Sequence, residues 1–238
     1  MILPTIRASL NRDDALHLVD LLARHDTALR DAARARLDEE GLDALLDDPR
    51  VLNALLTDPD VKAPPTLVFY VLVRQSLLEA GVEDRPTADY IASVMVAFGQ
   101  GRRAYRVSDE GDQEYRYLVD MVARLAESSP REAFLLRTHL GDYSLWLAGL
   151  FPDYLDARSR RKGAPPVEYF ERLGATGYVQ ASESTQAKDL GMEKVLHAVG
   201  RRFRKARVAL NNVADRYLWP DGGDPVGRLL REVAQTGR

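Results

Sequence analysis

The stretch 131–152, REAFLLRTHLGDYSLWLAGLFP, constrains the fold more than any other part of this chain. From 133 to 151 it is the longest mostly apolar run, and it is apolar nearly all round when wound at 100° per residue. A membrane span here would have to bury Arg137, His139 and Asp142, which is costly. The stretch therefore predicts a buried central helix, about 131–151, in a folded core.

Small residues form a strip along this helix and would let the backbone of another helix come close. The helix expected over 166–181 contains glycines, which cost about 1 kcal/mol each inside a helix and so suggest a close contact. We expect the two strips to face each other: Gly141, Ser144 and Ala148 on the first helix, and Gly174, Gly177 and Ala181 on the second.

The opposite side of the central helix carries polar and aromatic side chains, which must be hydrogen-bonded if they are buried. One hypothesis is a small-molecule pocket lined by Glu132, His139, Asp142, Tyr143 and Trp146, with Tyr169 from the following helix. A second is an enzyme in which His139 acts as a base and Asp142 orients it. A third is a purely structural hydrogen-bond network. A metal ion would need further ligands, and the E-x-x-H pairs of di-iron bundles are absent, so no metal or cofactor is predicted.

The remaining periodicity is helical almost throughout, and no run alternates cleanly enough to be a strand. We therefore expect an all-α, single-domain multi-helix bundle over 1–238, with one early helix over 13–37 and further helices over 66–80 and 87–98. Polar residues predict an exposed loop over 100–113, and the tail 220–238 is expected to contain one short helix. A long C-terminal helix, about 186–219, would form one wall of the bundle and could provide the seam of a homodimer.

A basic stretch lies on that last helix and could contact phosphates or an acidic partner. It consists of Arg201, Arg202, Arg204, Lys205 and Arg207. The net charge of −3 argues against a general attraction to nucleic acid, which is the less favoured partner. An adaptor function through this stretch is a further alternative.

Absent features narrow the function further. There is no cysteine, which removes disulfides, thiolate metal sites and cysteine nucleophiles, and no signal-peptide hydrophobic region, which favours the cytoplasm. Phosphate-binding loops, nucleophile elbows and H-E-x-x-H motifs are also missing. The sequence thus favours a binding or interaction protein over an enzyme.

Two segments, LGDYSLWLAGLFPDYL at 140–155 and VEYFERLGATGYVQAS at 167–182, resemble a pattern in uncharacterised bacterial all-helical proteins. The upstream run LVFYVLVRQSLLEAGVEDRPTADYIASVMVAFG is similar to the same group, so the resemblance covers about 45–182. It implies that the two halves form one unit. It implies no catalytic residue, cofactor or substrate.

Overall fold

The computed structural model describes residues 1–22, 27–57, 63–99, 107 and 118–218, and these residues form helices joined by short connections. The all-α class is confirmed. Apart from Val107, the expected loop 100–113 lies outside the described residues, as does the tail 220–238. The helices are α1 (Ile6–Ser9), α2 (Arg12–Leu22), α3 (Thr27–Glu40), α4 (Leu42–Leu46), α5 (Pro49–Thr57), α6 (Pro65–Glu79), α7 (Arg85–Gly99), α8 (Leu118–Leu125), α9 (Pro130–Leu150), α10 (Pro152–Lys162), α11 (Val167–Ser182), α12 (Thr185–Asp189), α13 (Glu193–Arg201), α14 (Phe203–Val213) and the π-helical turn η2 (Ala214–Leu218).

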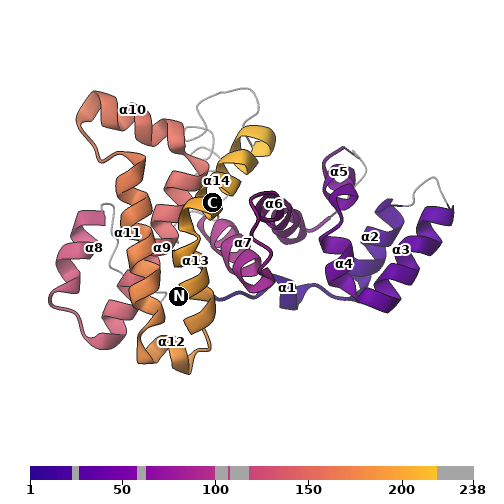
Figure 1. The fold of residues 1–238 in the computed structure, drawn as a ribbon, viewed down its shortest axis with the longest axis horizontal. Helices are drawn as coiled ribbons and strands as arrows, with labels where there is room; N and C mark the ends of the chain where they lie inside the picture. The colour runs from indigo at the N-terminus through magenta and orange to yellow at the C-terminus, as the bar shows by residue number, and fades with distance from the viewer. Residues whose placement is uncertain (23–26, 58–62, 100–106, 108–117, 219–238) are drawn as a thin grey trace, which may run out of the picture.

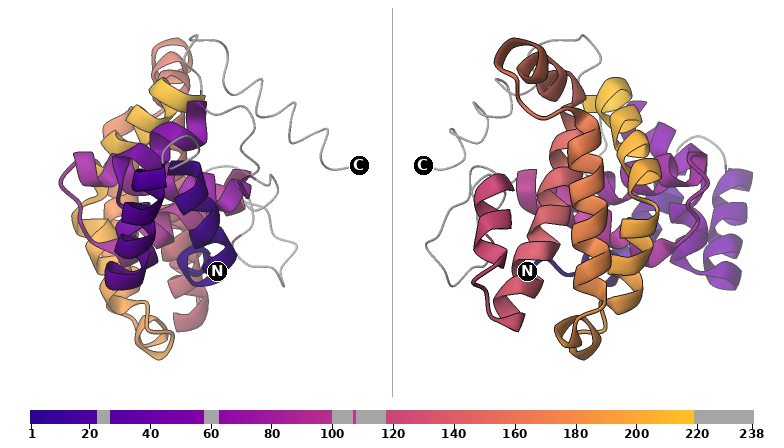
Figure 2. Two further views of the ribbon diagram at one scale, coloured as in Figure 1. Left: turned by 90° about the vertical axis from the view of Figure 1, so that its right-hand side faces the viewer. Right: turned by 60° about the vertical axis from the view of Figure 1, so that its left-hand side comes forward.

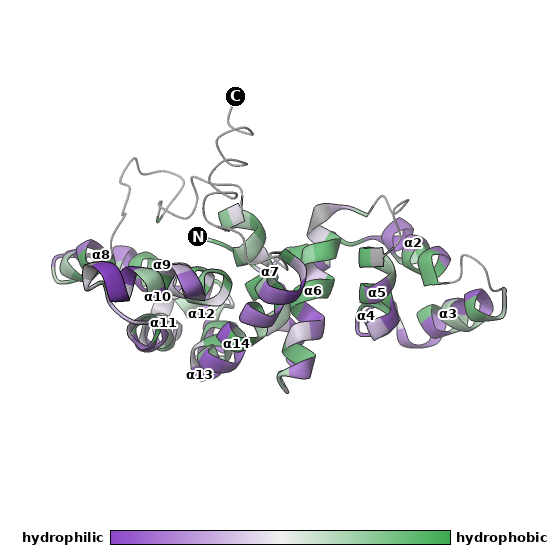
Figure 3. Cartoon of the chain, turned by 90° about the horizontal axis from the view of Figure 1, so that it is seen from above, coloured by the Kyte–Doolittle hydropathy of each residue, from purple (hydrophilic) through white to green (hydrophobic). Residues whose placement is uncertain are grey.

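The helices are arranged in an elongated row (Figures 1 and 3). A small cluster, α2 to α5, occupies one end, α6 and α7 lie in the middle, and α8 to α14 form a larger bundle at the other end. One buried hydrophobic cluster nevertheless runs through the molecule, from Leu18 in α2 to Leu210 in α14. No described helix is long and apolar enough to cross a membrane.

Helix α9 is the predicted central helix, and its boundaries agree with the sequence signals. The Ser129 side chain caps it by accepting a hydrogen bond from the Glu132 backbone N–H at 3.3 Å, and Pro130 occupies the first helical position. Most of its residues are buried, which confirms the inference drawn from its all-round apolar character.

The contact between α9 and α11 confirms the predicted meeting of small residues. A Cβ atom at Gly177 would lie 2.7 Å from the carbonyl oxygen of Arg137, and one at Gly174 would lie 2.8 Å from the Cβ of Ser144. A Cβ at Gly141 would lie 2.6 Å from the Tyr178 ring. The two helices run side by side in Figure 2 because these positions carry no side chain.

The predicted C-terminal helix over 186–219 is not one continuous helix. Gly191, with a φ of +67°, separates α12 from α13, because this left-handed conformation is open to glycine and ends a helix. Arg202 interrupts the helix again between α13 and α14 with φ −109° and ψ 17°. After this second interruption the chain continues as α14 and then widens into the π-helical η2 at Ala214.

The apolar stripe of α13 and α14 is buried within the chain, against α7, α9, α11 and α6. At the end of α9, the Asn211 side-chain amide donates to the carbonyls of Ala148 and Gly149 at 2.9 and 2.6 Å. These carbonyls belong to the last turn of α9 and have no partner within the helix. The stripe that could have provided a dimer seam therefore packs internally. A homodimer stays a prediction and would need another surface.

The expected helix over 13–37 is also divided. Helices α2 and α3 pack against each other as a pair rather than forming one rod. At the start of α2, the Asn11 side chain caps the helix by accepting from the backbone N–H groups of Asp13 and Asp14.

Candidate functional site

Asp142 is the polar centre of the bundle. Its Oδ1 accepts hydrogen bonds from the hydroxyls of Tyr90 in α7 and Tyr178 in α11, each at 2.7 Å. Only 2% of Asp142 is exposed, and both tyrosines are buried. One carboxylate oxygen in α9 thus links three helices. A buried charged group requires hydrogen bonds of this kind, because it has lost its contact with water.

Burial raises the pKa of Tyr90 and of Tyr178 well above the usual value, and the nearby negative charge of Asp142 raises both further. The phenols consequently stay protonated and act as donors. This arrangement suits a permanent structural link better than a proton-transfer site.

The rest of the predicted face is an aromatic packing surface. His139 is 4% exposed, and its ring lies 5.6 Å from that of Phe98 and 6.3 Å from that of Tyr143. Trp146 continues the row, with its ring 5.8 Å from Phe98 and 4.9 Å from Phe151. Four of the predicted residues, His139, Asp142, Tyr143 and Trp146, therefore share one buried face.

The space beside His139 and Asp142 is only about 10 Å³, and Met1 and Ile2 form part of its wall. This is room for about one water molecule. The acid/base hypothesis requires a depression open to solvent at His139, and the structure encloses that imidazole instead.

The structure places the other two predicted residues elsewhere. Glu132 is half-buried, and its carboxylate pairs with the guanidinium of Arg124 in α8 at 2.8 Å. Tyr169 lies at the start of α11, where its ring meets that of Phe170 edge-on at 5.8 Å. The tyrosines that reach Asp142 are Tyr90 and Tyr178; the sequence gives Tyr90 only as one member of an apolar helical stripe.

A larger cleft lies beside the N-terminal half of α9, between the first residues of the chain and α12. Its volume is about 610 Å³. Its walls are Met1, Leu3, Ser129, Arg131, Glu132, Phe134, Leu135, Gln186, Asp189 and Leu190. Of the predicted ligand-binding residues, Glu132 is the one that lines it. His139, Asp142, Tyr143 and Trp146 belong to the buried face of α9, and Tyr169 lies at the start of α11.

The basic stretch divides into two groups. Arg201, Arg202, Arg204 and Lys205 are exposed, whereas the Arg207 guanidinium pairs with Glu171 of α11 and donates to Asn211 Oδ1 at 2.5 Å. Arg207 is thus a link between α11 and α14, and four of the five predicted cations remain available at the surface.

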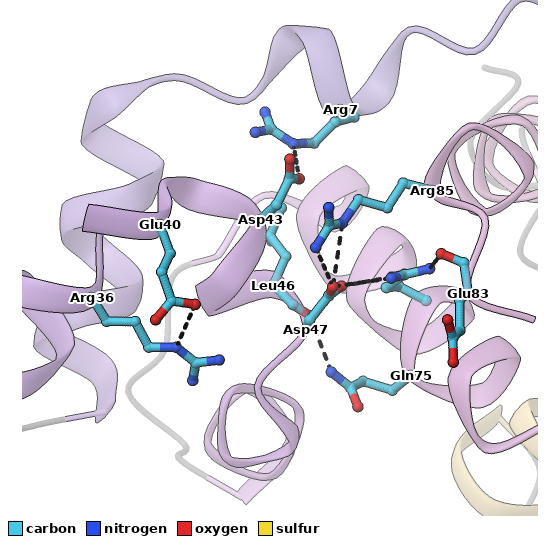
Figure 4. A network of polar contacts seen from close by, with 10 residues as sticks. Arg7, Arg36, Glu40, Asp43, Leu46, Asp47, Gln75, Glu83 and Arg85 are labelled. Atoms are coloured by element: carbon cyan, nitrogen blue, oxygen red, sulfur yellow. Dashed lines mark hydrogen bonds and ion pairs between the residues drawn. The ribbon is translucent and has the colours of Figure 1, made fainter. Parts of the chain in front are cut away.

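A second polar network, which the sequence did not reveal, joins the small helical cluster to the middle of the molecule (Figure 4). The buried Arg74 guanidinium in α6 donates to both carboxylate oxygens of Asp47, at 2.6 and 3.0 Å, and to the Glu83 carbonyl at 2.8 Å. Arg85 adds a third contact to Asp47 at 2.8 Å. Burial by itself would raise the pKa of Asp47, but the hydrogen bonds from Arg74 and Arg85 outweigh it and leave this pKa below the usual value.

Within the described part of the chain, no group of three or more His, Cys, Asp or Glu side chains is placed to hold a metal ion. No family model matches the sequence, and searches of curated proteins and of solved structures give no match either. The resemblance to bacterial all-helical proteins stays a prediction.

Proposed function

We propose that the protein binds a small amphipathic molecule in the cleft beside the N-terminal half of α9. The observation that carries this proposal is the cleft itself, whose volume of about 610 Å³ falls within the range of roughly 300–1,000 Å³ that is usual for small-molecule sites. This cleft is a different site from the pocket predicted at His139, Asp142, Tyr143, Trp146 and Tyr169, and Glu132 is the residue that it shares with that prediction.

The walls of the cleft suggest what the ligand would look like. Leu3, Leu135 and Leu190 offer apolar surface, and Leu190 is 51% exposed. Arg131 and Asp189 bring opposite charges to the same cleft. A molecule with an apolar body and polar groups would cover the exposed leucine while keeping its own polar groups near these two side chains.

Binding is favoured over catalysis because the acid/base candidates do not line this cleft. His139 and Asp142 belong to the enclosed face of α9, and the carboxylate of Glu132 is engaged by Arg124. What the cleft offers to a ligand is a shaped space and apolar contact, which serve binding.

The test is titration of the neutral fluorescent dye Nile red, which reports an apolar site without responding to surface charge. Leu190→Lys and Leu3→Lys place a charge in the cleft and should weaken dye binding at least about fivefold, since burying a charge against an apolar ligand is unfavourable. Leu56→Lys and Val208→Lys are the matched controls, because these side chains are similarly exposed but lie away from the cleft. Equal binding by all four variants, or no dye binding by the unaltered protein, would exclude the cleft as the site.

A further inference from the structure

Helices α13 and α14 present a row of basic side chains along their outward side. Lys194, His197 and Arg201 follow the spacing i, i+3 and i+7 on α13, which places them on one face of that helix, and Arg204 and Lys205 follow on α14, after the break at Arg202. All five are exposed, and the opposite face is buried. From Lys194 to Arg201 the row extends about 10 Å along the axis of α13.

This row lacks compensating negative charge. Between Glu193 and Asp215 the sequence contains no Asp or Glu. Arg201, Arg202, Arg204 and Lys205 form no ion pair with any described residue, whereas Arg36 and Arg50 both lie against Asp48, and Arg207 pairs with Glu171. Like charges held close together repel one another, so a partner that supplies negative charge would relieve the repulsion.

We propose that this row, Lys194 to Lys205, binds the phosphate backbone of double-stranded nucleic acid. A duplex supplies closely and evenly spaced negative charge along a line, and arginine forms bidentate hydrogen bonds with phosphate. The contact is independent of the cleft beside α9.

The surroundings of the row argue against the other polyanions. The apolar face of α13 and α14 is buried in the core, so it is not available to insert into a membrane surface. Val208 is the exposed large apolar side chain on these helices, whereas a protein partner would favour a more apolar contact; nucleic-acid interfaces are polar and basic. The row also contains no Phe, Tyr or Trp ring on which the bases of a single strand could stack.

The experiment is fluorescence anisotropy of a labelled DNA duplex of mixed sequence with the full chain. With about four phosphates neutralised, affinity should fall about 100-fold between roughly 50 and 200 mM salt. Arg201→Glu combined with Arg204→Glu should weaken binding at least about tenfold at low salt and make the salt dependence shallower. Both residues are exposed, and circular dichroism checks that this double variant is folded.

Arg12→Glu combined with Arg34→Glu is the matched control. It changes the net charge equally at two exposed arginines in α2 and α3, at the other end of the molecule, and should leave binding unchanged within about twofold. An equal loss in both double variants would overturn the proposal, as would a failure to bind the duplex at low salt. Tighter binding to polyglutamate or to phosphatidylserine vesicles than to the duplex would also overturn it, because the partner would then be an acidic protein or a membrane.

Discussion

The hydroxyl of Tyr178 in α11 donates a 2.7 Å hydrogen bond to Oδ1 of Asp142, in the middle of α9. Tyr90 of α7 donates to the same oxygen, so the carboxylate links three helices that are otherwise joined by apolar contacts. This bond also fixes the position of the Tyr178 ring over Gly141, where a Cβ atom would collide with it. The polar link and the small-residue contact therefore depend on each other.

Removing one of these hydroxyls should destabilise the protein. Tyr178→Phe and Tyr90→Phe each keep the ring but take away a donor from a buried carboxylate, which typically costs about 1–3 kcal/mol. Urea unfolding followed by circular dichroism measures this loss. Tyr154→Phe, at a half-buried tyrosine on α10, is the control and should change the free energy of unfolding by less than about 0.5 kcal/mol. If Tyr178→Phe and Tyr90→Phe change the free energy of unfolding as little as Tyr154→Phe does, Asp142 does not depend on these donors.

The close approach of α9 and α11 predicts opposite outcomes at two helical glycines. At Gly177 an added methyl group would meet the backbone carbonyl of Arg137, which a side-chain rotation cannot relieve. We expect Gly177→Ala to destabilise by about 1–3 kcal/mol. At Gly99, the last residue of α7, an added Cβ meets no atom within 4 Å. Gly99→Ala should be neutral or stabilise by up to about 1 kcal/mol, because alanine favours the helix.

Thermal unfolding of the two variants side by side separates packing from helix propensity. The melting temperature should fall for Gly177→Ala and hold or rise for Gly99→Ala. A fall of the same size in both would mean that the space at Gly177 is not what limits the substitution.

The ion pairs of Asp47 predict an acid-sensitive contribution to stability. The pKa of Asp47 lies below its ordinary value of 3.8 in the folded protein, because the hydrogen bonds from Arg74 and Arg85 outweigh the opposing effect of burial. A carboxylate with a lowered folded pKa stabilises the fold above its unfolded pKa, and this stabilisation is lost as the pH falls through the folded value. Asp47→Asn should thus lower the free energy of unfolding near neutral pH.

The difference between Asp47→Asn and the unaltered protein should then shrink as the pH falls below 3.8. Urea midpoints measured from neutral to acid pH give this comparison. Asp156→Asn is the control, since Asp156 forms an exposed pair with Arg160 that contributes little to stability. A difference in urea midpoint that stays constant across the whole pH range would contradict the lowered pKa of Asp47.

Much of the fold follows from local sequence. The all-round apolar character of 131–151 identified the central helix, and Gly141 and Gly177 pointed to its close neighbour. The division of the C-terminal helix was less evident because the apolar spacing continues across both breaks. Gly191 was the one signal, since glycine in a left-handed conformation ends a helix.

The candidate site depended on contacts that sequence spacing does not contain. The sequence showed that Asp142 and His139 share a face, but its helical period could not say what covers that face. Tyr90 lies 52 positions before Asp142 and Tyr178 lies 36 after it, and only the packing of α7 and α11 brings both to one oxygen. The same is true of Arg74 and Asp47, which are 27 positions apart.

The amino-acid sequence by itself determined that this protein is helical, that 131–151 is buried and that small residues admit a second helix. These properties arise from the periodicity and size of side chains within single helices. The tertiary structure decided that the polar face of α9 is enclosed, that the cleft lies at Glu132, and that Arg207 is paired with Glu171 whereas Arg201 and Arg204 form no ion pair with a described residue. Burial and pairing depend on which distant segments pack together, and the whole chain determines this packing.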